Sequence, residues 1–467
     1  MIVFLIGLFG FVLSLFFLAR ECLYRKRRIY RQKHDGKTII GIFHPYCNAG
    51  GGGERVLWCT VRAIQSQYPH CRIVIYTGDE IPAEKMIDNA RQRFNVEISA
   101  GVGFIYLSSR WFVEATTYPR FTLMGQSLGS MVLGFEALFK LNPDIYIDTM
   151  GYSFTYPLFR FLGQCKIACY VHYPTISTDM LGRVSQRTSA FNNNSTIAHS
   201  SVLSWFKLQY YKLFAAIYAM TGRCADSVMV NSSWTEDHIN QIWNISERTF
   251  KIYPPCDVQE FLQIAVDSEP ETFRIVAVAQ FRPEKDHPLM IRSFHTLLEN
   301  ISDEEREKVK LVLVGSCRHS EDFKRVDDYK RLCKHFNMED HVEFHLNVEF
   351  EQLKNLLQKS TIGLHAMWNE HFGISIVECM AAGLIMVAHK SGGPLLDDSQ
   401  TNRIGQGSSS DSAYSRCNRL YMNASERASW SPGNVECVAA CCCGASAGFS
   451  CVRIAEEVLE AFKLSLS

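Results

Sequence analysis

The 467-residue sequence lacks a net charge, because its 48 Lys and Arg residues balance its 48 Asp and Glu residues. A general nucleic-acid binder needs a basic surface along the phosphates, so this balance argues against that class of function. The 47% hydrophobic composition is that of a globular protein. The length is sufficient for two domains of about 200 residues each.

The sequence also lacks the cysteine pattern of a secreted protein. Its 17 cysteines are odd in number and scattered along the chain, which indicates a reducing compartment. Five of them lie close together near the end: Cys437, Cys441, Cys442, Cys443 and Cys451. Three of these are adjacent and no histidine lies near, whereas zinc sites need paired ligands at separated positions. We therefore predict no metal site.

Charged residues are missing from the first 19 positions. A helix of this length can cross a hydrocarbon core of about 30 Å, so residues 1–19 are predicted to be a transmembrane anchor. The flank 20–37 is rich in Arg and Lys, and the positive-inside tendency places it and the rest of the chain in the cytosol. A cleaved signal peptide is the alternative. It would have its basic residues before the apolar run and a small-residue cleavage site after it.

Strand-like apolar runs alternate with helix-like stretches, which is typical of parallel α/β layers. A first series of strands is predicted at 38–44, 72–78, 144–149, 166–173 and 226–233, and a second at 273–281, 310–316, 341–346, 361–367 and 384–393. Pro254 and Pro255 separate them and indicate a connector over 254–270. The predicted fold is α/β with two doubly wound, Rossmann-like domains, 38–253 and 271–394, facing a cleft that binds ligands.

Two further apolar stretches, 121–141 and 202–220, are long enough to span a membrane but contain interior polar residues such as Glu136 and Lys212. We expect both to be buried helices of the first domain. For the second stretch, an aromatic and Lys-bearing amphipathic helix lying on the bilayer is the alternative.

The glycines at 50–53 follow a predicted strand and precede a helix predicted from Glu54 to before Pro69. Such a loop directs backbone N–H groups and a helix N-terminus to one point, which suits a phosphate or a sugar hydroxyl. The loop matches neither of the common glycine-rich nucleotide motifs, so a flexible turn is the alternative.

Arg282 and Lys285 follow the strand at 273–281. Arg can bind a diphosphate through its bidentate fork and Lys as a point charge, with a solvated charge run as the alternative. Glu370 and Glu378 lie eight positions apart, the second on a helix predicted to begin near Gly373. Their carboxylates could accept hydrogen bonds from a sugar and a ribose, with a helix cap and a surface residue as the alternative.

The sequence resembles the retaining glycosyltransferases of family four, which have the GT-B fold, and more narrowly the α-1,2-mannosyltransferases of N-glycan assembly. Six ordered segments carry the resemblance up to about residue 394: GGGGERVLW, YVHYPTIS, NSSWTEDHI, IYPPCD, RPEKDH and NEHFGISIVECMAAG with SGGP. The resemblance implies that His172 and Glu370 act in catalysis. It implies donor binding by Gly51, Gly52, Gly53, Arg282, Lys285, Phe372, Gly373 and Glu378.

The reaction implied by the resemblance is transfer of mannose from GDP-mannose to dolichol-diphosphate-linked trimannosyl-chitobiose, with retention and without a protein nucleophile. It implies no cofactor and no metal, because Arg282 and Lys285 supply the cations and no persuasive DxD motif is present. It also implies a single-pass protein of the endoplasmic reticulum membrane with cytosolic catalytic domains, and other mannosyltransferases of the pathway as partners.

The segment 395–452 departs from the family pattern, because it is rich in Ser, Gly and Cys and has no helical or strand periodicity. We predict low order there, followed by a helix over 453–467. Two other functions therefore stay open. One is a GT-B enzyme with another nucleotide sugar or acceptor, including an epimerase; the other is an inactive membrane-bound partner of glycan-assembly enzymes.

Overall fold

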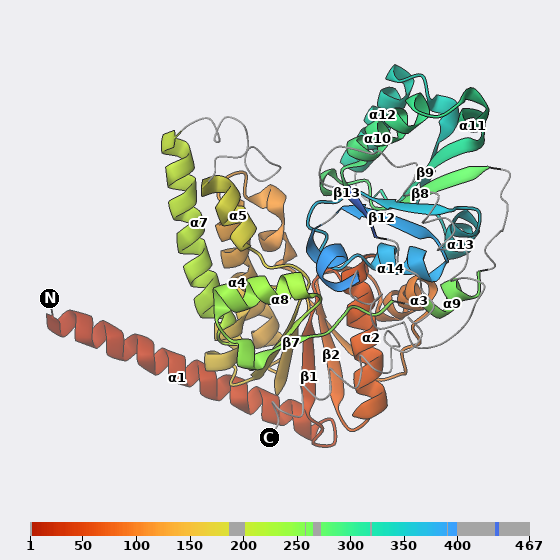
Figure 1. Cartoon of the computed structure of the whole chain (residues 1–467). Coiled ribbons are helices and arrows are strands. Elements are labelled where there is room, and N and C mark those ends of the chain that lie inside the picture. Colours follow the sequence, from red (N-terminus) through yellow and green to blue (C-terminus); the bar gives the residue numbers. More distant parts are fainter. Residues whose placement is uncertain are drawn as a thin grey trace. The chain divides into compact units, whose positions relative to one another are not determined.

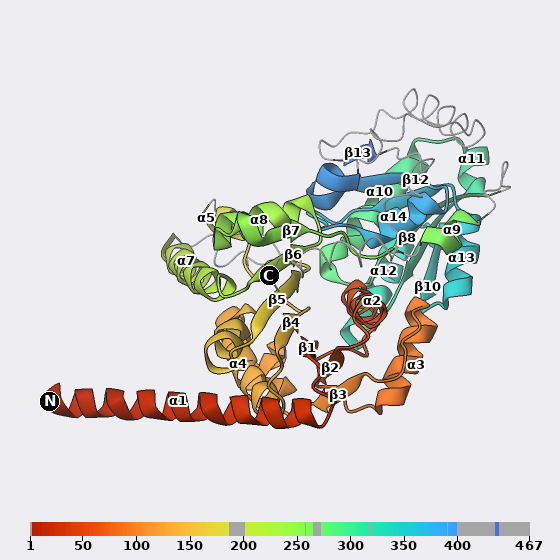
Figure 2. The same cartoon turned by 90° about the horizontal axis from the view of Figure 1, so that it is seen from below.

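A computed structural model describes residues 2–185, 201–256, 258–264, 272–317, 320–389, 391–398 and 435–438 (Figures 1 and 2). The chain divides into two compact units. The first runs to Asn231 and resumes over Thr235–Tyr253, and the second contains Ser232–Trp234 and the described residues that follow Tyr253.

The first unit is built on a seven-stranded sheet of order β3-β2-β1-β4-β5-β6-β7 in which every neighbouring pair is parallel. Its strands are β1 (Ile39–Phe43), β2 (Arg72–Thr77), β3 (Gly103–Tyr106), β4 (Ile145–Asp148), β5 (Lys166–Val171), β6 (Ser227–Val230) and β7 (Thr249–Lys251). The five predicted strands of the first series are confirmed. β3 and β7 were not predicted, because both are short edge strands without a long apolar run.

Helices cover both faces of this sheet. They are α1 (Ile2–Gln32), α2 (Gly52–Gln67), α3 (Ala83–Phe94), α4 (Thr122–Lys140), α5 (Thr178–Ser185), α7 (Ser201–Gly222) and α8 (Ser233–Trp243). Short turns are η1 (Arg110–Val113), η2 (Ala115–Thr117), η3 (Ser153–Thr155), η4 (Leu158–Leu162) and η5 (Ser246–Arg248).

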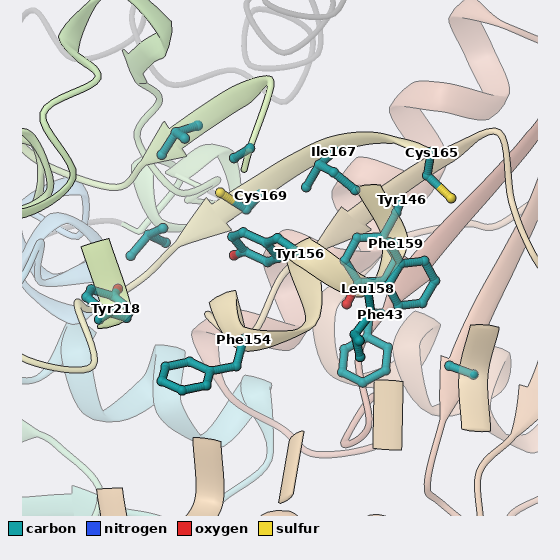
Figure 3. Close-up of a cluster of buried hydrophobic side chains, with 14 of the residues drawn as sticks. Phe43, Tyr146, Phe154, Tyr156, Leu158, Phe159, Cys165, Ile167, Cys169 and Tyr218 are labelled. Atoms are coloured by element: carbon teal, nitrogen blue, oxygen red, sulfur yellow. The ribbon is translucent and has the colours of Figure 1, made fainter. Parts of the chain in front are cut away.

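Alternate residues of β1 belong to two separate hydrophobic clusters. Ile39 and Phe43 lie in the first cluster, and Ile40 and Ile42 lie in the second. This is the pattern of a sheet buried on both sides. Figure 3 shows part of the first cluster.

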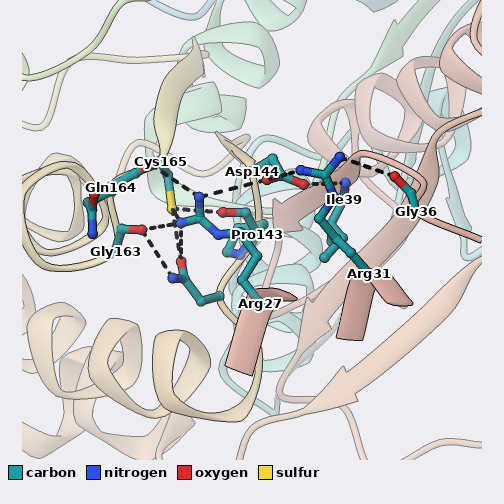
Figure 4. Close-up of polar contacts among 10 residues, drawn as sticks. Arg27, Arg31, Gly36, Ile39, Pro143, Asp144, Gly163, Gln164 and Cys165 are labelled. Carbon is teal, nitrogen blue, oxygen red and sulfur yellow. Dashed lines mark hydrogen bonds and ion pairs between the residues drawn. The ribbon is translucent and has the colours of Figure 1, made fainter. Parts of the chain in front are cut away.

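The predicted anchor 1–19 and the predicted basic flank as far as Gln32 form one continuous helix, α1, while 33–37 lie beyond its end. It contains the one candidate membrane span found among the described residues, Ile6–Gln32, whose most apolar part is almost entirely exposed. Its apolar end extends away from the first unit in both views (Figures 1 and 2). Its basic end packs against the unit, where the guanidinium of Arg27 is buried and donates to the backbone oxygen of Gly163 and, at 2.9 Å, to Asn142 Oδ1 (Figure 4).

Helices α4 and α7 pack into the first unit along one face each. On α4, Glu136 accepts hydrogen bonds from the backbone N–H groups of Ser108 at 2.8 Å and Ser109 at 2.9 Å. On α7, Phe214 and Tyr218 are buried. The expectation of fully buried helices is wrong for the opposite faces, which expose large apolar side chains because no described element covers them.

The second unit is built on a six-stranded sheet of order β10-β9-β8-β11-β12-β13. Its strands are β8 (Phe273–Val278), β9 (Val309–Gly315), β10 (Val342–Leu346), β11 (Ile362–His365), β12 (Ile385–His389) and β13 (Val435–Val438). The first five are parallel and confirm the predicted second series. β13 pairs antiparallel with β12.

The prediction that 395–452 has no regular structure is wrong at β13. The sequence pattern did not indicate this strand, because four residues are too few to show a strand periodicity. Pro394–Asp398 also forms a π-helical turn, η8. The rest of that predicted low-order segment, with most of its cysteines, and the predicted helix 453–467 lie outside the described residues.

The helices of the second unit are α9 (Val258–Leu262), α10 (His287–Glu299), α11 (Asp303–Lys308), α12 (Ser320–His335), α13 (Phe350–Gln358) and α14 (Ile374–Ala381), with short turns η6 (Pro283–Lys285) and η7 (Glu339–His341). α9 lies inside the predicted connector 254–270. It forms there because Phe261 is buried against the ring of Phe350, at a centroid distance of 5.4 Å.

In each sheet the strand order reverses at one point, between β1 and β4 in the first unit and between β8 and β11 in the second. Ligands of open α/β sheets bind outside the carboxyl ends of the strands at such a switch point. Most of the predicted site residues follow these strands.

Candidate functional site

Lys285 is held between a strand and a helix of the second unit. β8 ends at Val278, the turn η6 ends at Lys285, and α10 begins two residues later. Asp286 makes the junction, with a φ of 48° and a side chain that accepts the backbone N–H of Leu289 at 3.2 Å. This N-terminal cap fixes the direction in which Lys285 leaves the sheet.

Glu370 follows the neighbouring strand β11, and its side chain points toward the amine of Lys285. Its carboxylate Oε2 forms an ion pair with Lys285 Nζ and lies 2.9 Å from His365 Nε2. Its Oε1 accepts the backbone N–H of His371 at 3.0 Å. The residue is 8% exposed, so the structure brings Lys285, His365 and Glu370 into one buried cluster, called here the Lys–His–Glu cluster.

The electrostatics of this cluster favour an ionised carboxylate. Burial raises the pKa of Glu370, but the Lys285 cation and the hydrogen bond from His365 outweigh it and hold that pKa well below its usual range. A buried carboxylate next to a cation can accept a sugar hydroxyl, while the cation can bind a phosphate oxygen.

The loop of Glu370 is supported by the SGGP segment that follows β12. Gly393 N donates to the backbone oxygen of Glu370 at 2.7 Å, and Ser391 Oγ accepts the backbone N–H of Asn369 at 2.7 Å. A Cβ at Gly392 would collide with the Glu370 carbonyl, and its φ of 61° also favours glycine. These glycines therefore serve close packing of two loops.

The other predicted residues of the second unit lie around the cluster. Phe372 is buried, and Gly373 has a φ of 95° as the residue before α14, which confirms a helix start near Gly373. Glu378 is half-buried in the second turn of α14. Arg282 precedes η6, and its guanidinium lies 3.9 Å from Glu284, outside the Lys–His–Glu cluster.

The glycine segment of the first unit is part of a helix. The helix was predicted from Glu54, but α2 begins at Gly52 with Gly51 as its N-cap. The loop prediction for Gly52 and Gly53 is therefore wrong. The reason is local: Glu54 Oε2 accepts the backbone N–H of Gly51 at 2.6 Å, which favours helix initiation two residues earlier.

None of the glycines at 50–53 has a positive φ. Their backbone conformation is therefore open to other residues. A Cβ at Gly53 would lie 3.5 Å from His172 Nε2, an ordinary contact distance. The structure thus brings His172, which follows β5, next to Gly53.

The buried side chain of His44 lies next to Glu54. Its Nδ1 is 2.7 Å from Thr149 Oγ1, and its Nε2 is 3.6 Å from Glu54 Oε1. His44 follows β1 and Thr149 follows β4, the two strands that flank the switch point of this sheet.

Sequence reasoning missed His365, His44 and Glu54 as neighbours of the site. The available signal was a histidine at the end of an apolar strand, as in GIFH and TIGLH. The supporting role of SGGP had no such signal, because its contacts depend on loop packing. In the described part of the chain, no cluster of three or more His, Cys, Asp or Glu side chains could hold a metal ion.

The fold is similar to that of solved glycosyltransferases. Sucrose-phosphate synthase from Thermosynechococcus elongatus matches with a TM-score of 0.61 at 16% identity, over 91% of this chain and 98% of that one. Anabaena HepE in complex with UDP and glucose matches with a TM-score of 0.55 at 14% identity, over 91% and 99%. The two parallel-sheet units together with these neighbours define the GT-B fold.

The family follows from the sequence comparisons. Residues 37–243 match the model of the ALG11 mannosyltransferase N-terminus, and residues 259–431 match that of glycosyl transferases group 1. A Xenopus laevis relative is 54% identical over 84% of this chain and 81% of its own length, and a Homo sapiens relative is 51% identical over 81% and 78%. Both are named GDP-Man:Man(3)GlcNAc(2)-PP-Dol alpha-1,2-mannosyltransferase, and this chain belongs to that family.

The motifs indicated a family resemblance only up to about residue 394, but the match to the glycosyl transferases group 1 model extends further. It ends at residue 431, inside the segment 395–452 that the sequence pattern separates from the family.

Proposed function

We propose that this chain transfers mannose in α-1,2 linkage from GDP-mannose to dolichol-diphosphate-linked Man(3)GlcNAc(2), adding the fourth and fifth mannoses with retention of configuration. One observation carries the proposal: Lys285 and Glu370 meet in a buried cluster at the switch point of the second sheet, in a chain about half identical to relatives with that name.

In this reaction the second unit binds the donor. Lys285 and Arg282 neutralise the diphosphate, Glu370 holds the mannose, and Glu378 accepts a ribose hydroxyl, with Phe372 and Gly373 shaping the loop between the two glutamates. Fixed charges placed where negative charge develops on the leaving group lower the barrier without a metal ion. Lys285 is suited to this role because its partner Glu370 already holds it in place.

The first unit contributes the glycine segment and His172 to the same reaction. Because no positive φ requires glycine at 51, 52 or 53, we attribute these residues to the space that a sugar diphosphate needs. The start of α2 then presents the backbone N–H groups of Gly52 and Gly53 to a phosphate. His172 lies at Gly53, next to the transferred sugar in this proposal.

The setting that fits this acceptor is the cytosolic face of the endoplasmic reticulum membrane, with α1 as a single-pass anchor. The basic residues at the carboxyl end of α1 support that orientation. Other mannosyltransferases of the same assembly line are the protein partners we expect.

The test is a transfer assay with the purified full chain in detergent, GDP-mannose, and the dolichol-linked trimannosyl acceptor. The unmutated chain should add two mannoses, and Lys285→Ala and Glu370→Ala should each abolish most of the transfer. A chain that transfers nothing would instead be an inactive partner, and transfer unaffected by both substitutions would remove the site assignment.

A second measurement identifies the donor. GDP, UDP and ADP are added as competitors at equal concentrations, and GDP should inhibit most strongly. Stronger inhibition by UDP or ADP would favour a GT-B enzyme with another nucleotide sugar.

A further inference from the structure

One face of α4 exposes only large apolar side chains over three turns. Leu128, Val132, Phe135 and Phe139 are 38–51% exposed, and their spacing of four, three and four residues places them on one side of the helix. The rings of Phe135 and Phe139 stack at a centroid distance of 6.3 Å. A helix face in water normally carries polar residues, so this stripe indicates contact with an apolar medium or partner.

α7 exposes a second stripe. Phe206, Leu213 and Met220 recur every seven residues and are 58–67% exposed, and Trp205 lies beside them. Lys207 extends over the ring of Tyr211, with its amine 5.5 Å from the ring centroid. Aromatic and long aliphatic side chains flanked by lysine are typical of a helix that lies in the interface of a bilayer.

The two stripes belong to neighbouring helices of the first unit. The backbone N–H of Met124, in the first turn of α4, donates to Tyr210 Oη of α7 at 3.0 Å. At the other end of α4, Lys26 of α1 donates to the Phe139 backbone oxygen at 3.4 Å. The candidate membrane span and the two exposed stripes are thus joined within one unit.

α1 also holds the first unit in one orientation. Besides the buried Arg27, Arg31 Nη1 lies 3.4 Å from Asp144 Oδ1, and Asp144 in turn accepts the backbone N–H of Ile39, the first residue of β1 (Figure 4). The candidate membrane helix is therefore tied directly to the sheet of the first unit.

The directions of α1 and α7 are compatible with one bilayer, which α1 would cross and α7 would lie along. The apolar end of α1 projects beyond the side of the first unit on which α7 lies, in both views, and α7 runs across the direction of α1 in Figure 1. A spanning helix crosses the bilayer and an interfacial helix lies in its plane. One bilayer can therefore receive α1 and contact α7 at the same time.

We propose that α4 and α7 form a second membrane contact, in which the exposed stripes of both helices rest in the lipid surface that α1 crosses. The occupant is phospholipid, because the stripes lie in the unit that α1 anchors and combine apolar side chains with flanking lysines. The proposal rests on α1 as the membrane anchor proposed above, but it does not depend on the transfer reaction.

The test uses the full chain in phosphatidylcholine vesicles that contain radiolabelled phosphatidylcholine. A photoreactive benzophenone side chain replaces Val132 or Leu213, one at a time, and Arg91 of α3 is the matched control, because its side chain is also well exposed, at 68%. Illumination should attach several-fold more labelled lipid at Val132 and Leu213 than at Arg91. Thermal unfolding of each variant checks that the fold is intact.

The second arm of the test introduces a charge into the exposed stripe of α7. With the photoreactive group at Phe206, Leu213→Glu should reduce lipid attachment several-fold, while Arg91→Glu should leave it unchanged. Lipid attachment at the helix sites no greater than at Arg91 would overturn the proposal. So would cross-linking of two chains to each other at both helices, which would make this face an interface between copies.

Discussion

Lys285 and Glu370 form a partly buried ion pair although 85 positions separate them in the sequence. They follow β8 and β11, which are neighbours in the sheet and flank the point where its strand order reverses. The pair is possible because adjacent parallel strands end at the same edge of a sheet. Each residue thus keeps the other in place at the carboxyl edge of the sheet, the site proposed above for the donor.

Removing one partner of this pair should destabilise the fold more than removing both. Lys285→Met leaves the buried carboxylate of Glu370 without its cation, with hydrogen bonds from His365 and the His371 backbone, and we expect a loss of about 3 kcal/mol in unfolding free energy. Adding Glu370→Gln should recover part of that loss, because the unpaired charge is gone. Thermal unfolding of the two variants in detergent measures the difference.

The control for this prediction is Lys354→Met. Lys354 is as exposed as Lys285 and pairs with Glu260 at 3.2 Å in the same unit, but outside the candidate site. Its removal should lower the unfolding temperature much less, because a surface ion pair is screened by water. Equal losses for Lys285→Met and the double variant would show that the Glu370 charge is not held by Lys285.

His365 should act as a positioning residue for Glu370. His365→Ala removes the hydrogen bond to Glu370 Oε2, and a misplaced carboxylate should lower kcat/KM about 100-fold. His365→Gln keeps a donor near the same position and should restore much of that loss. A structural role alone would give no such rescue. His295→Ala, which removes a histidine paired with Glu299 on α10, is the control and should transfer normally.

The strands and the main polar positions could be predicted from the sequence because both follow from long apolar runs. A parallel strand buried on both faces is a continuous hydrophobic run, and the first polar residues after it mark the carboxyl edge of the sheet. Lys285 was found in this way, whereas His172 was given by the resemblance in motifs. The resemblance in motifs then separated Glu370 and Glu378 from ordinary helix-cap and surface glutamates.

The features of the fold and the site that could not be predicted depend on contacts between segments that are distant in the sequence. His365 meets Glu370 only because their loop folds back over the end of β11, and Gly392 and Gly393 support that loop from beyond β12. β7 is only three residues long and gains its hydrogen bonds from β6. No local pattern records such pairings, because tertiary contacts decide them.

A bulky side chain at Gly52 should abolish transfer while the fold stays intact. Gly52 is exposed in the first turn of α2 and has no positive φ, so Gly52→Leu fits the helix but fills the space assigned to the donor. We expect at least a 100-fold loss of kcat/KM, the order found when a transition-state contact is removed. Ser66→Leu, an exposed change in the last turn of the same helix, is the control. Normal transfer by Gly52→Leu would make the segment a plain helix start.

Asp148 should make stability depend on pH. It is fully buried at the end of β4, and burial raises its pKa to about 6 even though Tyr156 Oη donates to it at 2.7 Å. The raised pKa means that the folded state favours the protonated acid. Stability should therefore fall as the pH rises from about 4 to about 6, and the ionised form should carry a cost of about 3 kcal/mol at pH 7.5.

Asp148→Asn removes this titration and keeps an oxygen for the backbone N–H of Met150, which donates to Asp148 at 2.9 Å. The variant should unfold at a higher temperature than the unmutated chain at pH 7.5, with a gain that shrinks toward pH 4.5. Asp88→Asn, an exposed change on α3, should show the same small difference at both pH values. A gain for Asp148→Asn that does not change with pH would contradict the assignment.

Arg27 should be the residue that joins α1 to the first unit. Its guanidinium is buried and donates to Gly163, to Asn142 at 2.9 Å and to the backbone oxygen of Gln164 at 3.3 Å. Arg27→Met keeps the length of the side chain but leaves these acceptors unpaired, and we expect a loss of about 3 kcal/mol.

The matched control is the neighbouring Arg28, which is exposed on the same helix. Arg28→Met should change the unfolding free energy by less than about 0.5 kcal/mol. Thermal unfolding in detergent compares the two variants. Partial proteolysis then shows whether the region around 33–37 becomes easier to cleave in Arg27→Met, as expected if α1 separates from the sheet. Equal unfolding temperatures and equal cleavage for both variants would mean that apolar packing alone holds α1 in place.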